Sequence, residues 1–270
     1  MQRIRLGLLL ALSGSSACFA APTPRTRPAS PPAEHLSQGV VAERGIPYVP
    51  GGDSSQTLDL YLPEHAPDHT LPPVVRIHGG GWMGGSRAGC PAVRMVRRGY
   101  VAASVEYRFS QKAIFPTQIQ DCQPALRWLR ANAAKYHIDP DHVGVWGASA
   151  GGHRVALLGT AGGKRAFEPI GGNDEQSDRV QAVCDLFGPT DFNTVVAQAA
   201  PDKTKNIFRF NHPGDPHSQL IGVPLNSDAA KCDAVSPVHC VSKDNPPILI
   251  LHVTTDALVP FAQSPTGCGS

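Results

Sequence analysis

Short apolar runs recur along the chain from Val40 onward, separated by polar stretches rich in glycine and proline. They predict seven strands, at residues 40–43, 57–62, 74–78, 101–107, 143–147, 180–187 and 248–253. The first two runs lie close together, which is typical of an antiparallel sheet edge. The later runs are apolar on both faces, as in a buried parallel sheet.

A helical pattern occupies residues 115–136, where Ile119, Cys122, Leu126 and Leu129 recur at helical spacing. Pro124 lies inside this stretch and is expected to kink or interrupt the helix. Strands that alternate with helices predict an α/β fold with a doubly wound, mostly parallel sheet.

Residues 161–246 differ from the rest in carrying much Gly, Pro, Asp and Asn around a single strand. Segments of this composition are irregular and lie on the surface. We interpret them as insertions that form a lid or the wall of a cleft.

Residues 1–20 have the pattern of a signal peptide. Arg3 and Arg5 precede the apolar run 6–12, and small residues before Ala20 offer a cleavage site. The mature protein is therefore expected to begin at residue 21 and to be secreted or periplasmic.

A lipoprotein anchored through Cys18 is the less favoured alternative, because Ser15 stands where a large aliphatic residue is expected. Residues 21–38 are rich in proline and predict an extended linker. The remaining residues, 39–270, are assigned to one domain.

Net charge is +2, and charged residues make up 17% of the chain. This balance indicates neither a nucleic-acid partner nor an anionic membrane surface. After residue 20 no apolar run is long enough to span a membrane. The oligomeric state stays open at this stage.

Removal of the signal leaves six cysteines, and an exported protein meets conditions in which disulfides form. Cys122 and Cys184 lie in apolar patterns and are expected to be inert core thiols. Cys232 and Cys240 are the favoured disulfide pair, although the pairing stays open. No spacing of His and Cys indicates a metal site, and no motif calls for a cofactor.

The sequence Gly147-Ala148-Ser149-Ala150-Gly151 reads G-x-S-x-G and follows a predicted buried strand. In a nucleophile elbow, such a serine sits on a strained strand-to-helix turn that projects its hydroxyl into a cleft. Glycines flank it because side chains there would collide with neighbouring elements. A glycine-rich turn that happens to contain serine is the alternative.

A second motif, His78-Gly79-Gly80-Gly81, also follows a predicted strand. It has the form of an HGGG-type oxyanion loop. The N–H groups of Gly80 and Gly81, with that of Ala150 after the serine, are the predicted oxyanion donors. A phosphate loop is excluded, because no Gly-Lys-Ser/Thr follows.

With both motifs in place, the chain resembles the HGGG-type carboxylesterases of the α/β-hydrolase superfamily, a group that includes hormone-sensitive-lipase-like esterases. Among these it is most similar to secreted bacterial feruloyl/acetyl esterases. The stretches that carry the resemblance are residues 58–63, 78–85, 104–108, 115–121, 125–132, 147–153, 187–192 and 246–264.

The resemblance implies a serine carboxylesterase that needs no cofactor and acts on a small or polysaccharide-linked ester. Ser149 would be the nucleophile, and Asp256 the acid that orients a histidine. Asp191 is the rival acid, with a turn or helix-capping role as its alternative. His78 and His252 would be structural.

The chain departs from the family pattern near its end. Val253 and Ala257 replace a glycine and a proline around Asp256, and only 14 residues follow that acid. The family's catalytic histidine comes further on, after another helix and strand. We therefore expect a truncated hydrolase that lacks the last strand and helix.

Two hypotheses follow. One is an esterase of plant-polysaccharide feruloyl or acetyl groups, and the other is an impaired remnant or carbohydrate-ester binding protein that lacks the triad histidine. His153, one helical turn after Ser149, is the most plausible substitute base but is not expected to act.

Overall fold

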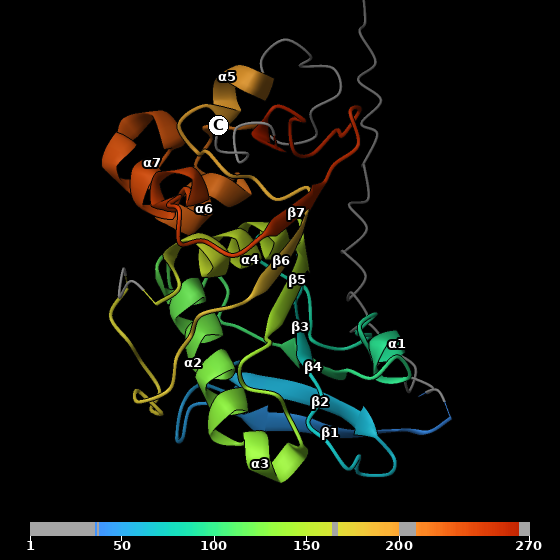
Figure 1. The fold of residues 1–270 in the computed structure, drawn as a ribbon. Helices are drawn as coiled ribbons and strands as arrows, with labels where there is room; N and C mark the ends of the chain where they lie inside the picture. Colours follow the sequence, from blue (N-terminus) through green and yellow to red (C-terminus); the bar gives the residue numbers. More distant parts are fainter. Residues whose placement is uncertain (1–35, 37, 164–166, 200–208, 265–270) are drawn as a thin grey trace, which may run out of the picture. The chain divides into compact units, whose positions relative to one another are not determined.

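A computed structural model describes residues 36, 38–163, 167–199 and 209–264 (Figure 1). The predicted signal peptide, residues 1–20, and most of the linker, 21–38, lie outside the described residues, as does the tail from 265. The residues described here all belong to one unit, 34–270.

Seven strands form a single sheet with the order β1-β2-β4-β3-β5-β6-β7. They are β1 (Val40–Pro47), β2 (Thr57–Pro63), β3 (Pro73–Ile77), β4 (Val101–Val105), β5 (Gly144–Ala148), β6 (Ala182–Leu186) and β7 (Ile248–Leu251). The β1–β2 and β2–β4 pairs are antiparallel, and the pairs from β4 to β7 are parallel. All seven predicted strands and the antiparallel edge are confirmed.

The helices connect and cover these strands. They are α1 (Val93–Val96), α2 (Thr117–Ala131), α3 (Ala133–Tyr136), α4 (Ala150–Ala161), α5 (Val195–Ala199), α6 (Pro216–Ile221) and α7 (Ala229–Val235), with short 3₁₀ turns η2 (Leu225–Ser227) and η3 (Pro237–Cys240).

The expected interruption of the long helix at Pro124 is wrong, because the helix ends later in the chain. The helix α2 continues through Pro124, and the change to α3 comes at Asn132. The apolar stripe predicted for this helix is buried, including Ile119 and Leu126. Its packing against the sheet outweighs the backbone hydrogen bond that proline cannot make.

Helices cover the two faces of the sheet unequally (Figure 1). On one face α2 and α4 bury a large core that includes Val75, Val145 and Leu157. On the other face α1 packs over β2 and β4, around Tyr61. On β7, Leu249 and Leu251 are 55% and 52% exposed. Among the described residues, apolar side chains on β7 thus lack a covering layer.

The segment after β6 forms its own apolar cluster, in which α6 and α7 pack around Phe192 and Trp82. A Cβ on Gly81 would come within 3.2 Å of Pro216, so α6 lies against the glycine-rich loop. The interpretation of this region as a lid or the wall of a cleft stays a prediction.

The favoured disulfide is wrong. Cys232 is a free thiol whose Sγ lies 3.3 Å from the carbonyl oxygen of Leu225, a hydrogen bond that holds the side chain inside its cluster. Cys122 is a buried free thiol as predicted, and burial raises its pKa to about 12. Within the described part of the chain, no helix has the length and apolar character to cross a membrane.

Candidate active site

Ser149 lies between β5 and α4 with φ 56° and ψ −123°, at a positive φ that non-glycine residues rarely adopt. Its N–H donates to the carbonyl of Leu186 at 2.9 Å, which ties the turn to β6. Its own carbonyl accepts from His153 N at 3.0 Å, which starts the helix. This strand-to-strained-turn-to-helix geometry is that of a nucleophile elbow.

The two glycines of the G-x-S-x-G motif are sites of close backbone approach. A Cβ on Gly147 would lie 2.3 Å from the carbonyl oxygen of Gly151. A Cβ on Gly151 would lie 2.2 Å from the carbonyl oxygen of Ile77, at the end of β3. Any larger residue at either position would push α4 away from the sheet.

The glycine-rich loop after β3 lies against this elbow. A Cβ on Gly79 would be 2.6 Å from the carbonyl oxygen of Ala148 and 3.5 Å from Cβ of Ser149. Gly80 has φ 115°, and a Cβ there would meet the Gly84 carbonyl oxygen at 2.2 Å. The fold therefore brings the two motifs together.

The predicted oxyanion donors are available for a ligand. Within the described residues, the N–H groups of Gly80 and Gly81 donate to no backbone or side-chain acceptor. Ala150 is the first residue of α4, and a helix leaves its first N–H groups without an intrahelical partner. The positive end of the helix dipole also lies here, which favours a developing negative charge.

His78 braces the loop, as the resemblance implied. Its Nε2 contacts Glu106 Oε1 at 2.7 Å, and its Nδ1 contacts the carbonyl oxygen of Gly79 at 2.8 Å. The ring stacks on Tyr107 with centroids 4.3 Å apart. The other oxygen of Glu106 accepts the N–H of Arg87 at 3.1 Å, so one carboxylate holds both ends of the loop.

Sequence reasoning did not find this role for Glu106. The residue lies in the stretch 104–108, which was noted only for its likeness to the family. Its position directly after β4, beside the end of β3, is the signal that could have indicated it.

Asp256 lies in the loop after β7. Its Oδ1 accepts the N–H groups of Leu258 at 2.7 Å and Val259 at 2.9 Å. Its Oδ2 is 3.6 Å from Nε2 of His252, whose Nδ1 contacts Ser264 Oγ at 2.6 Å. The predicted acid is thus held by its own turn and faces His252.

No histidine in the described ranges forms a hydrogen bond with the hydroxyl of Ser149. His153 has both ring nitrogens engaged, since Nδ1 accepts from Trp82 Nε1 at 3.2 Å and Nε2 donates to the Val235 carbonyl at 2.8 Å. Burial lowers its pKa to about 3, so the ring is neutral near pH 7. These contacts argue against His153 as a substitute base.

Asp191, the rival acid, caps a turn. Its Oδ1 accepts the N–H of Asn193, and its Oδ2 accepts the hydroxyl of Thr194, both at 2.9 Å. Gln263 Oε1 in turn accepts the N–H groups of Thr190 and Asp191 at 2.8 Å. These contacts fit the capping alternative considered for Asp191.

A second buried carboxylate lies beneath the elbow and was not singled out from the sequence. Asp185 pairs in register with Gly147, and a Cβ on Gly152 of α4 would be 2.2 Å from its Oδ1. That oxygen accepts the N–H of Gly188 at 2.8 Å, whereas Oδ2 has no partner among the described residues. Burial raises the pKa of Asp185 to about 6.

Comparison with known proteins agrees with this geometry. The BD-FAE family model matches residues 58–266. Esterase LipQ of Mycobacterium tuberculosis is 30% identical over 223 residues, which cover 81% of this chain and 50% of LipQ. The chain therefore spans half the length of that relative.

Two solved structures are also similar. A truncated form of a carbohydrate esterase from gut microbiota has a TM-score of 0.76 at 29% identity, over 87% of this chain and 84% of that chain. A bifunctional GH43-CE protein of Bacteroides eggerthii has a TM-score of 0.72 at 28% identity, over 83% of this chain and 29% of that chain. Within the described residues, no group of three or more His, Cys, Asp or Glu side chains is placed to hold a metal ion.

Proposed function

Because the chain belongs to the BD-FAE family of α/β-hydrolase esterases, we propose that it works as a serine carboxylesterase through Ser149. The observation that carries the proposal is the strained backbone of Ser149 beside the glycine-rich loop, with φ 56° at the start of α4.

In the proposed reaction, the Ser149 hydroxyl attacks the ester carbonyl and loses its proton to a base. The carbonyl oxygen becomes an oxyanion that accepts hydrogen bonds from Gly80, Gly81 and Ala150. The alkoxy group leaves with a proton, and an acyl-serine remains. Water then attacks this ester, which releases the acid and restores Ser149.

The base is the part of this mechanism that the described residues do not supply. Asp256 would orient a histidine by accepting from its Nδ1–H, as in other serine hydrolases. The same observation favours a second candidate function, an ester-binding protein that retains the elbow and the oxyanion loop without full turnover.

For the substrate we propose a feruloyl or acetyl ester on a plant polysaccharide. The similar structure from gut microbiota is named a carbohydrate esterase, which supports a carbohydrate alcohol. The signal-like residues 1–20 support an exported protein, which would meet such polymers outside the cell.

A fluorophosphonate probe tests the serine when imidazole is added as the base that the described residues do not supply, because the phosphorus of the probe is attacked by an activated hydroxyl. We expect mass spectrometry of the treated protein to find the adduct on Ser149, and Ser149→Ala to abolish labelling. Ser86, which is exposed and lies outside the elbow, should stay unmodified. Labelling of Ser149→Ala at the same rate would contradict the assignment.

A further inference from the structure

The three predicted oxyanion donors come from two separate parts of the chain. Gly80 and Gly81 lie in the loop after β3, whereas Ala150 is the first residue of α4. Their N–H groups can meet one oxygen only if the loop and the helix keep a fixed separation, because such a site depends on donors held in advance of the reaction. The contacts that tie the loop to α4 therefore bear on the chemistry.

A hydrogen bond between Trp82 and His153 joins these two parts. Trp82 directly follows Gly81, and its Nε1–H donates to His153 Nδ1 at 3.2 Å. Both residues are buried, at 2% and 1% exposure. Since His153 belongs to the first turns of α4, the bond runs from the glycine-rich loop to the helix that begins directly after Ser149.

The loop glycines thus lie between two points of attachment to the elbow. Before them, a Cβ on Gly79 would be 2.6 Å from the carbonyl oxygen of Ala148, which is a close backbone approach. After them, the Trp82 bond reaches α4. Glu106, at the end of β4, holds the same loop to the sheet through His78.

The surroundings of His153 fix its imidazole as an acceptor toward the indole. Its Nε2 lies 2.8 Å from the carbonyl oxygen of Val235, which can only accept, so Nε2 carries a proton. Burial lowers the pKa of His153 to about 3, so near pH 7 the ring is neutral and Nδ1 carries none. The N–H of Trp82, which can only donate, is the complement of that Nδ1.

Trp82 depends on such a restraint because its backbone is strained. Its φ is 58°, a genuine outlier for a bulky residue, and such a conformation persists only where its surroundings hold it. The indole packs against the rings of Phe192 and His217, with centroids 5.7 and 5.1 Å away. The hydrogen bond to His153 adds a direction to this packing, because such bonds weaken steeply as their angle changes.

We propose that His153 is a positioning residue, which holds Gly80 and Gly81 in line with Ala150 through its hydrogen bond to Trp82. The inference rests on the proposed function, because it assigns an effect on the oxyanion donors of that site. His153 acts through the indole and exchanges no proton with the substrate.

Two substitutions of His153 separate its two hydrogen bonds. In His153→Asn the amide oxygen stands as many bonds from Cβ as Nδ1 does, so the acceptor for Trp82 is kept. In His153→Gln the amide nitrogen stands as many bonds from Cβ as Nε2 does, so the donor to Val235 is kept and the acceptor for Trp82 is lost. Each variant loses one buried hydrogen bond, so a merely structural role predicts similar effects for the two.

The rate at which a fluorophosphonate labels Ser149 in the full chain, with imidazole added as the base, tests the proposal. We expect His153→Gln to slow labelling about tenfold, less than loss of a whole donor would, and His153→Asn to stay within about twofold of the unmodified rate. Trp82→Phe, which keeps a ring but removes the donor, should slow labelling as well. In that background His153→Gln should cause no further loss, because both changes remove the same bond.

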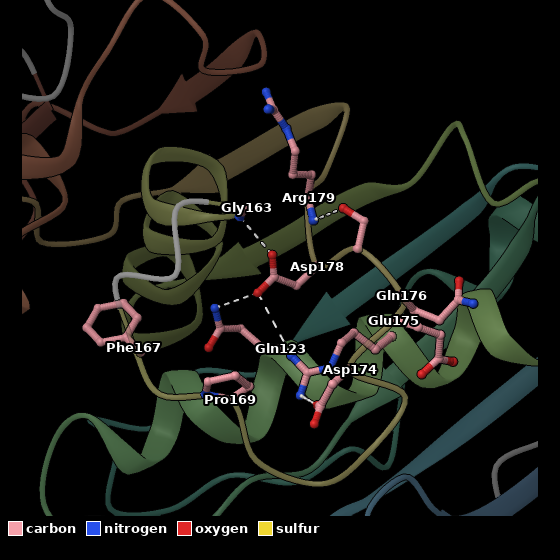
Figure 2. A pocket seen from close by; sticks show the side chains of 11 residues that line it. Gln123, Gly163, Phe167, Pro169, Asp174, Glu175, Gln176, Asp178 and Arg179 are labelled. Carbon is pink, nitrogen blue, oxygen red and sulfur yellow. Dashed lines mark hydrogen bonds and ion pairs between the residues drawn. The ribbon is translucent and has the colours of Figure 1, made fainter.

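Gln123→Met is the matched control, because it breaks a buried hydrogen bond near the other end of α4. Gln123 is 4% exposed, and its Nε2 donates to Asp178 Oδ2 at 2.7 Å, in the wall of a cavity of about 460 Å³ (Figure 2). Asp178 also accepts the N–H of Gly163, beyond the last residue of α4. The helix has 12 residues, so this end lies about 18 Å from the elbow. The control should lower the unfolding temperature and leave the labelling rate unchanged.

Hydrogen exchange followed by NMR measures the restraint without any reaction at Ser149. The N–H of Ser110 donates to the carbonyl oxygen of Trp82 at 2.9 Å, so its exchange reports on release of that residue. We expect this amide to exchange faster in His153→Gln than in His153→Asn.

Equal labelling rates in His153→Gln and His153→Asn, whether fast or slow, would overturn the proposal, as would equal exchange of the Ser110 amide in the two variants. An unmodified chain that takes up no label would instead contradict Ser149 as the nucleophile. In that case the exchange of Ser110 still decides for or against the role of His153, so the two failures are distinguishable.

Discussion

Asp185 is buried beneath the first turn of α4, and its pKa of about 6 compares with 3.8 for an exposed aspartate. Between pH 3.8 and about pH 6, Asp185 keeps its proton in the folded protein but loses it in the unfolded chain. The stability contributed by this group is therefore present at low pH and is lost as pH rises through 6. Near pH 7 the folded state carries an ionised carboxylate with no counter-charge hydrogen-bonded to it among the described residues.

Asp185→Asn should consequently raise the free energy of unfolding at pH 7.5 and leave it almost unchanged at pH 4. The neutral amide still accepts from Gly188 N but never ionises. The free energy of unfolding at pH 7.5 should rise by about 2–3 kcal/mol. Urea unfolding at both pH values measures it, with exposed Asp244→Asn as the control. An equal effect at the two pH values would show that the ionisation of Asp185 does not limit stability.

Glu106 connects His78 to the N–H of Arg87, and so fixes both ends of the loop that carries Gly80 and Gly81. In Glu106→Gln one carboxylate oxygen is replaced by an amide NH₂ group, which cannot accept a hydrogen bond. Turned toward Arg87, this group opposes the backbone N–H, and turned toward His78 it requires an imidazole with no proton on Nε2. The oxyanion donors should then lose their alignment, although no group that touches the substrate has changed.

We expect Glu106→Gln to slow phosphonylation of Ser149 by a fluorophosphonate, measured with imidazole added as the base, about 10- to 100-fold, less than the 10²–10³ typical of a lost oxyanion donor. Glu64→Gln, at the exposed end of β2, should react at the unmodified rate. Thermal unfolding of both variants is the accompanying measurement. Unchanged labelling in a folded Glu106→Gln protein would remove Glu106 from any positioning role.

The sequence predicts a site residue best where its proposed role depends on its neighbours in the chain. Ser149, Gly80 and Gly81 stand in contiguous motifs, so their backbone needs could be deduced from neighbours in the chain. Glu106 and Asp185 act on residues from other strands, and no local pattern shows which side chains the sheet register brings together.

At the scale of elements, the strand pattern was sufficient to predict the sheet but not the ends of its helices. Apolar runs buried on both faces are distinctive, and each predicted strand is present. Pro124 was given too much weight, because burial of the α2 stripe overrides a single lost backbone bond. The cysteine pairing failed because sequence separation says nothing of side-chain direction, and Cys232 points into its own apolar cluster.

The edge strand β7 exposes apolar side chains to solvent. Leu249 and Leu251 alternate with partly covered isoleucines and are more than half exposed. An apolar strand at a sheet edge also offers unpaired backbone groups to another chain. This edge is therefore expected to promote self-association of the 270-residue chain.

Leu249→Lys combined with Leu251→Lys should suppress that association. Because both positions are exposed, each substitution should change the free energy of unfolding by only about 0.5 kcal/mol. Sedimentation velocity across a concentration series is the measurement. Val41→Lys, at an exposed position on the opposite edge strand β1, is the matched control and should have little effect. If Val41→Lys disperses the protein equally well, net charge rather than the β7 edge is responsible.

At the scale of the whole molecule, the strained turn at Ser149 lies against the glycine-rich loop, and Asp256 is held in the loop after β7. None of the described histidines is hydrogen-bonded to the hydroxyl of Ser149. His78, His153 and His252 are each held by other hydrogen bonds. A serine hydroxyl is a weak nucleophile at neutral pH unless a base removes its proton. Proton transfer from Ser149 should therefore limit hydrolysis by the 270-residue chain.

The last prediction follows from that limit. The chain should hydrolyse 4-nitrophenyl acetate with a kcat about 10⁶ lower than that of a serine hydrolase whose histidine contacts the serine hydroxyl, the usual cost of losing that histidine. Added imidazole should restore part of the rate in proportion to its neutral form, because it can enter and accept the Ser149 proton. Since imidazole also cleaves this ester in solution, the rate with Ser149→Ala must be subtracted at each concentration. A Ser149-dependent rate that is fast without imidazole would instead place a histidine of this chain at the serine, and replacement of His153, His217 and His252 in turn would then identify it.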